Sequence, residues 1–238
     1  MLEVKNITYH YKKKGFSIEN INLKLEDGYF AVLLGENGAG KTTFLRAIYK
    51  MYKTKSGEIF WNGEKITNDN LHIYRKDVAY IEDGNWCIDW KTVTENVGLL
   101  KDIYSTFDEA VFYENLKCFG FSENLLDRKY RELSTGEQMK FQIAFVLARR
   151  PKLVIMDEPF ANLDPIVKTD LIEKLHQNVM NNKMSVLLST HLVEDITDII
   201  DYIGIMNEGK MKAFGDREEI LSQYNSESIR KFFCRISD

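Results

Sequence analysis

The sequence is poor in cysteine, proline and glycine, and each shortage argues against a class of protein. The three cysteines, Cys87, Cys118 and Cys234, are odd in number and far apart, so they signal neither a zinc site nor a disulfide framework. A reducing, cytosolic compartment is therefore expected. Only 3 prolines and 14 glycines occur among the 238 residues, which argues against low-complexity linkers.

Long apolar runs and an excess of basic charge are also missing. A membrane-spanning helix needs about 18 or more apolar residues in a row, and no window of the sequence approaches that length. The first residues, Glu3 among them, lack the apolar core of a secretory signal. The formal net charge is −4, so nothing indicates a nucleic acid as partner. The chain instead has an ordinary globular mixture of 44% hydrophobic and 29% charged residues.

Short apolar runs alternate with longer helical patterns, which predicts an α/β fold. A hairpin is expected over 58–66, because Asn62 and Gly63 both tolerate the positive φ of a two-residue turn. Runs typical of buried parallel strands lie at 29–34, 153–156 and 186–188. Helical patterns cover about 98–131, 165–182 and 216–235.

One glycine-rich segment carries recognisable chemistry. Residues 35–43 match the phosphate-binding loop, which is Gly, any four residues, then Gly-Lys-Ser/Thr. Such a loop turns successive backbone N–H groups towards phosphate oxygens, and the helix that follows adds its positive end. A glycine-rich turn that fits by chance is the alternative, but here an apolar strand precedes the motif and a helical pattern follows it. The residues expected to contact the nucleotide are Gly35, Glu36, Asn37, Gly38, Ala39, Gly40, Lys41, Thr42 and Thr43.

Two adjacent carboxylates complete the expected phosphate chemistry. Asp157 and Glu158 follow the apolar run 153–156, at the edge of an α/β sheet where ligands bind. Asp157 is predicted to act on magnesium together with the Thr42 hydroxyl, and Lys41 is predicted to reach the β- and γ-phosphates. Glu158 is then free to orient or deprotonate an attacking water. A strand that merely ends in solvated acids is the alternative reading of this pair.

The segment Leu133-Ser134-Thr135-Gly136-Glu137-Gln138, between these motifs, resembles the signature of ATP-binding-cassette (ABC) ATPases, the nucleotide-binding subunits of ABC transporters. Other segments match that family in order. Asp164 resembles the D-loop residue and His191 the switch histidine. Tyr11 stands where an aromatic residue stacks on adenine, although Tyr9 could pack there instead. Asp83 lies where the family usually has the glutamine of its Q-loop.

The resemblance implies a fold and an assembly. The fold is the P-loop ABC core in a single domain over 1–221, with a small antiparallel β-subdomain and a helical subdomain inserted at about 97–135. A helical C-terminal tail is expected over 222–238. The assembly is a head-to-tail dimer around two ATP molecules with Mg²⁺, formed with a second copy or a homologous subunit. In that dimer the phosphate loop of one copy faces a set of residues of the other, namely Ser134, Thr135, Gly136, Glu137 and Asp164.

Two residues depart from the family pattern. Asp83 replaces an amide by a carboxylate, which is a better ligand for a hard cation such as Mg²⁺. Glu137 replaces a glutamine and adds negative charge near the opposing phosphates, which either weakens dimer closure or turns to solvent. Asp83 and the Leu-Ser-Thr-Gly signature resemble the ABC-2-type exporters, so export is the expected direction.

The resemblance also implies a membrane transporter subunit as partner and a peripheral position on the inner face of the cell membrane. Trp86 and Trp90 are expected in a groove that receives a helix of that subunit, or alternatively in the core. A soluble ABC ATPase acting in DNA repair or on the ribosome is the alternative function, but the chain shows one cassette without heptads or a basic patch. Glu158 argues against a third possibility, a regulatory module that binds ATP without hydrolysing it.

Overall fold

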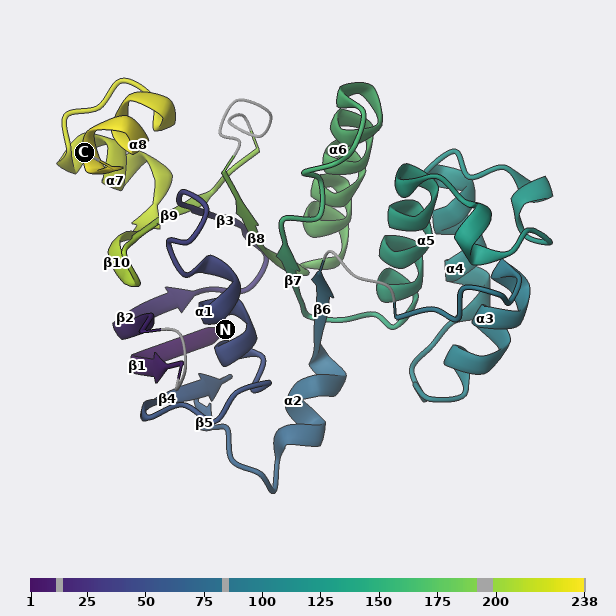
Figure 1. Ribbon diagram of the computed structural model, residues 1–238, viewed down its shortest axis with the longest axis horizontal. Helices are drawn as coiled ribbons and strands as arrows, with labels where there is room; N and C mark the ends of the chain where they lie inside the picture. Colours follow the sequence, from purple (N-terminus) through teal and green to yellow (C-terminus); the bar gives the residue numbers. More distant parts are fainter. Residues whose placement is uncertain (12–14, 83–85, 192–198, 238) are drawn as a thin grey trace.

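The computed structural model describes residues 1–11, 15–82, 86–191 and 199–237, which form two β-sheets and a set of helices (Figure 1). Lys12 to Lys14, expected in a solvated loop, lie outside these residues. The strands are β1 (Leu2–His10), β2 (Ser17–Leu25), β3 (Phe30–Leu34), β4 (Ser56–Trp61), β5 (Glu64–Lys65), β6 (Val78–Glu82), β7 (Leu153–Asp157), β8 (Ser185–Thr190), β9 (Tyr202–Asn207) and β10 (Lys210–Asp216). The helices are α1 (Lys41–Ile48), α2 (Leu71–Asp77), α3 (Val93–Lys101), α4 (Glu109–Cys118), α5 (Thr135–Ala148), α6 (Pro165–Asn182), α7 (Arg217–Gln223) and α8 (Ile229–Ser237), with short 3₁₀ turns η1 (Glu123–Leu125) and η2 (Tyr130–Glu132).

The smaller sheet is antiparallel, with strand order β2-β1-β4-β5. The predicted hairpin is confirmed, and it joins β4 to β5 through Asn62 (φ 52°) and Gly63 (φ 82°). Two consecutive positive φ values are typical of the tight turn that suits the right-handed twist of a hairpin. Buried residues on one face of β1 and β2, such as Leu2 and Ile21, contact α1 and the larger sheet through a shared core.

The larger sheet has the order β10-β9-β3-β8-β7-β6, and β3, β6, β7, β8 and β9 run parallel to their neighbours among them. The apolar runs predicted as buried strands are confirmed, since every residue of β3 and β7 is buried. Their side chains alternate between two cores. Val32 and Met156 face the core that contains α5 and α6, whereas Leu33 and Ile155 face the core that contains α1. The predicted α/β class is therefore confirmed.

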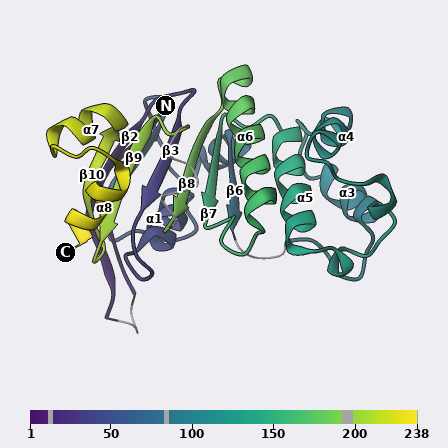
Figure 2. The ribbon, with the colours of Figure 1, turned by 90° about the horizontal axis from the view of Figure 1, so that it is seen from above.

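Helices α3, α4 and α5 lie between β6 and β7 in the sequence, at the end of the molecule remote from α7 and α8 (Figures 1 and 2). An aromatic cluster forms the core of this region. Phe141 of α5 is fully buried, and its ring lies 5.5 to 6.2 Å, between centroids, from the rings of Trp86, Phe112, Tyr130 and Phe145. The region predicted as a helical insert, about 97–135, spans α4 and most of α3 and ends where α5 begins.

The C-terminal part of the chain contains two helices where the sequence predicted one over 216–235. The break follows α7, at Asn225, whose φ of 48° is left-handed and cannot continue a helix. Ile229 and Phe232 of α8 are buried against the main core, so the tail packs on the domain. Within the described ranges, no helix has the length and apolar character needed to cross a membrane.

Replacing Phe141 by Ala tests the aromatic cluster. The substitution leaves a cavity among four rings, so we expect the free energy of unfolding to fall by about 3 to 5 kcal/mol. Replacing Leu99, which is 46% exposed on α3, by Ala should change it by about 0.5 kcal/mol or less. Urea denaturation followed by circular dichroism measures both. Equal losses in the two variants would contradict the placement of Phe141.

Candidate nucleotide-binding site

The predicted phosphate loop joins the end of β3 to the start of α1, as the motif requires (Figure 1). Gly38 and Gly40 have φ values of 89° and 103°, which other residues rarely adopt. A Cβ atom on Gly40 would also lie 2.9 Å from the Ile18 side chain, and one on Gly35 would lie 2.6 Å from the Met206 carbonyl oxygen. The loop therefore needs glycine at these positions for both conformation and space.

The loop is supported from the far end of the chain. The N–H of Gly209, in the turn between β9 and β10, donates to the Ala39 carbonyl at 3.0 Å. The Gly209 carbonyl accepts from the N–H of Glu19 on β2 at 2.9 Å, so this one residue joins the loop, β2 and the turn. The exposed part of the loop, 36–38, is left facing outward.

Lys41 lies folded over the loop. Its side chain is 5% exposed, and its Nζ donates to the carbonyl oxygens of Gly35 at 2.6 Å and Glu36 at 3.2 Å. Thr42 is half-buried and Thr43 is buried, in the first turn of α1. Within the described residues, no side chain caps this helix end and no acidic residue occupies its first turn. The free N–H groups and the positive helix end thus remain available to an anion.

The two predicted carboxylates lie beside the loop, at the carboxyl end of β7. Asp157 pairs in register with Ser189 of β8, and the buried Ser189 hydroxyl donates to Asp157 Oδ1 at 2.7 Å. The same hydroxyl accepts from the Glu158 N–H at 3.1 Å. Glu158 has a left-handed φ of 48°, which takes it out of the alternation of the strand. Sequence reasoning missed Ser189, although its place just before Thr190 and His191 could have indicated it.

Glu158 contacts both other predicted catalytic residues. Its Oε1 lies 3.0 Å from Lys41 Nζ, and its Oε2 lies 2.7 Å from His191 Nδ1. The Glu158 side chain is 20% exposed and His191 is 36% exposed, so the carboxylate reaches the cleft while remaining held on two sides. The structure thus brings Lys41, Asp157, Glu158 and His191 together as expected.

A cleft of about 330 Å³ lies above this cluster. Tyr11, the residue expected to stack on adenine, lines this cleft. Its hydroxyl lies 3.3 Å from the Thr43 hydroxyl. Tyr9 packs beside it, edge-on at 5.0 Å between centroids, and is not among the residues that line the cleft. Phe16, which sequence reasoning missed, also lines the cleft. Its pairing with Tyr11 across the hairpin, from the Tyr11 N–H to the Phe16 carbonyl at 3.1 Å, places both aromatic residues at the mouth.

The signature-like residues lie elsewhere in the same chain. Ser134 caps α5, and α5 is separated from α1 by β7 and α6 in both views (Figures 1 and 2). Glu137 is half-buried, and its carboxylate is bonded at the start of its own helix. Its Oε2 accepts from the Ser134 N–H at 2.7 Å and from the Ser134 hydroxyl at 2.8 Å, in a capping box. Thr135 and Gly136 occupy the first turn of α5, and Asp164 caps α6 by accepting from the Ile166 N–H at 2.9 Å. Asp83 lies outside the described residues.

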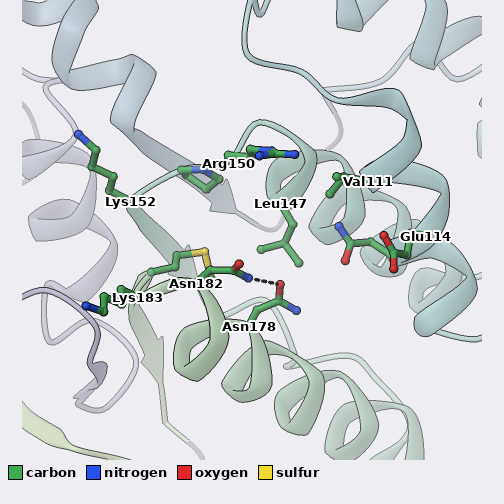
Figure 3. Close-up of a pocket in the computed structure, with 11 residues that line it drawn as sticks. Val111, Glu114, Leu147, Arg150, Lys152, Asn178, Asn182 and Lys183 are labelled. Carbon is green, nitrogen blue, oxygen red and sulfur yellow. Dashed lines mark hydrogen bonds between the residues drawn. The ribbon is translucent and has the colours of Figure 1, made fainter.

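A larger cavity, of about 540 Å³, lies between α4 and the C-terminal ends of α5 and α6 (Figure 3). Two of its basic residues have acidic partners, because Arg150 pairs with Asp108 and Lys152 with Asp77, each at 2.8 Å. Helix C-termini carry partial negative charge, which basic residues stabilise. Helix packing accounts for this cavity, and the predicted chemistry lies in the smaller cleft.

Comparison with known proteins decides the family. The model of the ABC transporter family matches residues 18–161. This chain belongs to the ABC transporter family. The chain is 30% identical to the ATP-binding protein EcfA2 of an energy-coupling factor transporter from Caldanaerobacter subterraneus subsp. tengcongensis, over 93% of this chain and 81% of that protein. It is 35% identical to the phosphonates import ATP-binding protein PhnC of Lactobacillus delbrueckii subsp. bulgaricus, over 82% of this chain and 81% of that protein.

Solved structures agree with the fold. A structure described as the ATP-binding subunit of an ABC transporter has a TM-score of 0.86 and 27% identity, and each chain is fully covered. The dimeric ATP-binding cassette MJ0796 bound to ADP and Pi has a TM-score of 0.79 and 26% identity, over 91% of this chain and 98% of that one. The predicted ABC ATPase fold is therefore confirmed.

The chain is an ABC ATPase and the ATP-binding subunit of a transporter. Nothing among these relatives supports the alternative in DNA repair or on the ribosome. The finer prediction of an ABC-2-type exporter is not confirmed either, because the relatives named here serve energy-coupling factor and import systems.

Replacing Ser189 by Ala in this ABC ATPase tests the support of the two carboxylates. The change leaves the Glu158 N–H with one partner fewer and Asp157 without its hydroxyl donor. We expect unfolding free energy to fall by about 1 to 3 kcal/mol and ATP hydrolysis to fall about tenfold. Hydrolysis is measured by phosphate release and stability by thermal unfolding.

Ser185→Ala is the matched control. Ser185 is buried at the other end of β8, where its hydroxyl accepts from the Gly28 N–H at 2.8 Å and donates to the Glu26 carbonyl at 3.2 Å. Its loss should cost similar stability and leave hydrolysis per folded molecule unchanged. An equal loss of hydrolysis in both variants would show that Ser189 acts through stability alone.

Proposed function

We propose that this chain closes head-to-tail on a second ABC subunit around two Mg-ATP molecules, hydrolyses them, and thereby drives a separate membrane subunit. The observation that carries this proposal is the position of Glu158. Its carboxylate is held between Lys41 of the phosphate loop and His191, beside Asp157 and at the floor of the cleft.

The charge pattern of the cleft supports this proposed position of ATP. The N–H groups at the start of α1 and of the loop would hold the phosphates, and the base would lie at Tyr11. Lys41 forms an ion pair with Glu158 at 3.0 Å. When Lys41 turns to the β- and γ-phosphates, Glu158 loses this partner and keeps His191. The carboxylate is then free to accept a hydrogen bond from water.

Two described residues fit a magnesium ion. Asp157 is buried to 5% exposure, and Ser189 occupies only its Oδ1, so the carboxylate keeps further lone pairs for a water or a cation. The Thr42 hydroxyl lies in the first turn of α1, beside the loop. Magnesium in such sites is held by one or two protein groups together with substrate phosphates. Bound magnesium would supply neutralisation of phosphate charge, and Asp83, which follows β6 in the sequence, is proposed as a further ligand.

Hydrolysis follows from these positions. Glu158 orients a water for in-line attack on the γ-phosphate and accepts its proton, while His191 holds the carboxylate and approaches the phosphate from β8. Lys41 and the loop N–H groups stabilise the charge that develops on the phosphate oxygens. Each of these groups lies at a strand end, in the loop or at the start of α1, which the parallel sheet positions.

The second subunit supplies what the first lacks. Ser134, Thr135, Gly136 and Glu137 are at the N-terminus of α5, remote from this chain's own loop (Figure 1). A helix N-terminus with small residues suits close approach to the γ-phosphate of a facing subunit. In the capping box, the Glu137 carboxylate accepts hydrogen bonds from the N–H and the hydroxyl of Ser134. Closure then requires the Ser134 hydroxyl to exchange this carboxylate for a phosphate oxygen.

The membrane subunit is proposed to dock beside α3. Trp90, Ile103 and Leu99 are 69%, 66% and 46% exposed there, which is unusual for large apolar side chains. Trp86 has a different role, because its ring packs on Phe145 at 5.1 Å between centroids. Of the two tryptophans expected in the docking groove, we therefore propose Trp90 for the groove and assign Trp86 to the core. Docking on a membrane subunit would place the chain peripherally on the membrane.

The direction of transport stays a prediction from the sequence. Asp83 and the Leu-Ser-Thr-Gly segment favour export through an ABC-2-type partner. Nothing in the cleft distinguishes the two directions, since the same phosphate chemistry serves both. The membrane subunit also selects the cargo, so reconstitution with that subunit is the measurement that assigns direction.

Replacing Glu158 by Gln tests the catalytic role. The amide keeps the size of the side chain but cannot accept the proton from water, so turnover should fall about 10²- to 10⁴-fold. ATP binding should be kept, and the dimer should accumulate with ATP. Phosphate release and size-exclusion chromatography with ATP measure these two effects. Undiminished turnover would refute Glu158 as the base, and Glu218→Gln, at an exposed site, is the control.

Replacing Trp90 by Ala tests the docking surface. Loss of an exposed anchor should weaken binding to the membrane subunit by at least tenfold, which corresponds to about 1.4 kcal/mol, and leave ATP hydrolysis by the isolated chain unchanged. Pull-down of the membrane subunit in mild detergent measures it. Ile73→Ala, 51% exposed on α2, is the control, and the docking proposal fails if Trp90→Ala binds as wild type does.

A further inference from the structure

A connected set of polar side chains runs from the end of β6 to the aromatic residue at the nucleotide cleft. Glu82 is the last residue of β6. Its Oε2 lies 3.0 Å from Arg46 Nε and 2.9 Å from Arg46 Nη2, both on α1. Arg46 Nη1 donates to the Tyr52 hydroxyl at 3.3 Å. The Tyr11 hydroxyl donates to the same Tyr52 oxygen, also at 3.3 Å. Tyr52 thus accepts from two elements that are far apart in the sequence.

Ring contacts hold the same residues. Tyr52 stacks on Tyr9 with centroids 4.8 Å apart and planes 11° from parallel. Tyr11 lies edge-on to Tyr9 at 5.0 Å and to Tyr52 at 6.0 Å. Burial alone would raise the pKa of the Tyr52 hydroxyl, but the hydrogen bonds from Tyr11 and Arg46 lower that pKa below its ordinary value. The ring and hydroxyl of Tyr52 therefore both act on Tyr11.

The sheet explains why Arg46 lies there. Glu82 is the register partner of Asp157 on the neighbouring strand β7, so two carboxylates stand side by side at the phosphate end of the sheet. Adjacent like charges repel each other. The Arg46 guanidinium balances the Glu82 charge on the side facing α1. Arg46 Nη1 also donates to Tyr52. Arg46 thereby connects Tyr9, Tyr11 and Tyr52 to the carboxylates at the floor of the site.

We propose that Arg46 and Tyr52 are positioning residues that hold Tyr11 against the base of the nucleotide, with Glu82 as their anchor. This inference rests on the proposed function, since it takes ATP at the loop and its base at Tyr11. Thr43, which the Tyr11 hydroxyl also contacts, is expected to turn to a phosphate when ATP binds. The contact with Tyr52 is kept, and a ring held in place beforehand loses less entropy on binding.

Tyr52→Phe is the central test, because it keeps the ring on Tyr9 and removes only the hydroxyl that accepts from Tyr11 and Arg46. Calorimetry compares Mg-ATP with ribose 5-triphosphate, which has the phosphates and sugar but no base. We expect ATP to bind about three- to tenfold more weakly, as for the loss of one or two hydrogen bonds. Binding of ribose 5-triphosphate should not change, and in steady state the loss should fall on KM rather than kcat. Arg46→Met should also weaken ATP binding, but it leaves the Glu82 charge unbalanced beside Asp157 and is therefore expected to weaken ribose 5-triphosphate as well.

A double-mutant cycle separates positioning from general damage. If Tyr52 acts through Tyr11, Tyr52→Phe should have no further effect on ATP affinity in a Tyr11→Ala background. Tyr29→Phe, at an exposed tyrosine on the approach to β3, is the control and should leave both affinities unchanged. Thermal unfolding of each variant confirms that it is folded.

The possible failures are distinct. Equal weakening of ATP and ribose 5-triphosphate by Tyr52→Phe, or an undiminished effect in the Tyr11→Ala background, would overturn the positioning role. The positioning role would also be overturned if Tyr11→Ala weakened ATP binding and Tyr52→Phe left ATP affinity unchanged. If Tyr11→Ala leaves the preference for ATP over ribose 5-triphosphate unchanged, the proposed place of the base is wrong. If the unsubstituted chain binds neither compound, the proposed function itself fails.

Discussion

The parallel pairing of β3, β8 and β7 is the constraint on which the site depends. Parallel strands end at one edge, and these three end in the phosphate loop, in Thr190 and His191, and in Asp157 and Glu158. The Ser189 hydroxyl then locks β8 to both carboxylates. A shift of one residue in this register would move Asp157 away from Ser189 and turn the buried side chains to the opposite core. The positions of the catalytic groups in the cleft therefore depend on the register of these strands as well as on the identity of each residue.

Much of this arrangement could be predicted from the sequence, because its signals are local. Fully apolar runs indicated β3 and β7, Asn62-Gly63 indicated the hairpin, and the glycine pattern indicated the loop. Lys41, Asp157, Glu158 and His191 could be placed together since each follows a predicted strand end. The break between α7 and α8 could not be predicted, because the helical pattern continues through a residue that adopts a left-handed conformation, Asn225.

The residues that sequence reasoning missed act across long separations. Ser189 matters because of its strand neighbour, and Tyr52 because α1 and β1 bring Arg46 and Tyr11 to it. Phe16 lines the cleft because its carbonyl pairs with the Tyr11 N–H between β1 and β2. Glu137 illustrates the opposite case. Its capping box with Ser134 is a local pattern, and the charge that was expected to face phosphates or solvent is directed to the start of its own helix.

The support of the phosphate loop by Gly209 has a consequence for the order of events during synthesis. The loop and all of the motifs up to His191 leave the ribosome before the turn that holds Ala39 exists, and β3 waits for β8 and β9 as partners. A nascent chain that already carries every catalytic residue thus lacks this support of the loop. Folding by such distant contacts is slow and leaves β3 exposed in the meantime. Nucleotide affinity is therefore acquired only after Gly209 has been synthesised, so a chain truncated before Gly209 would retain the motifs and lose this support of the loop.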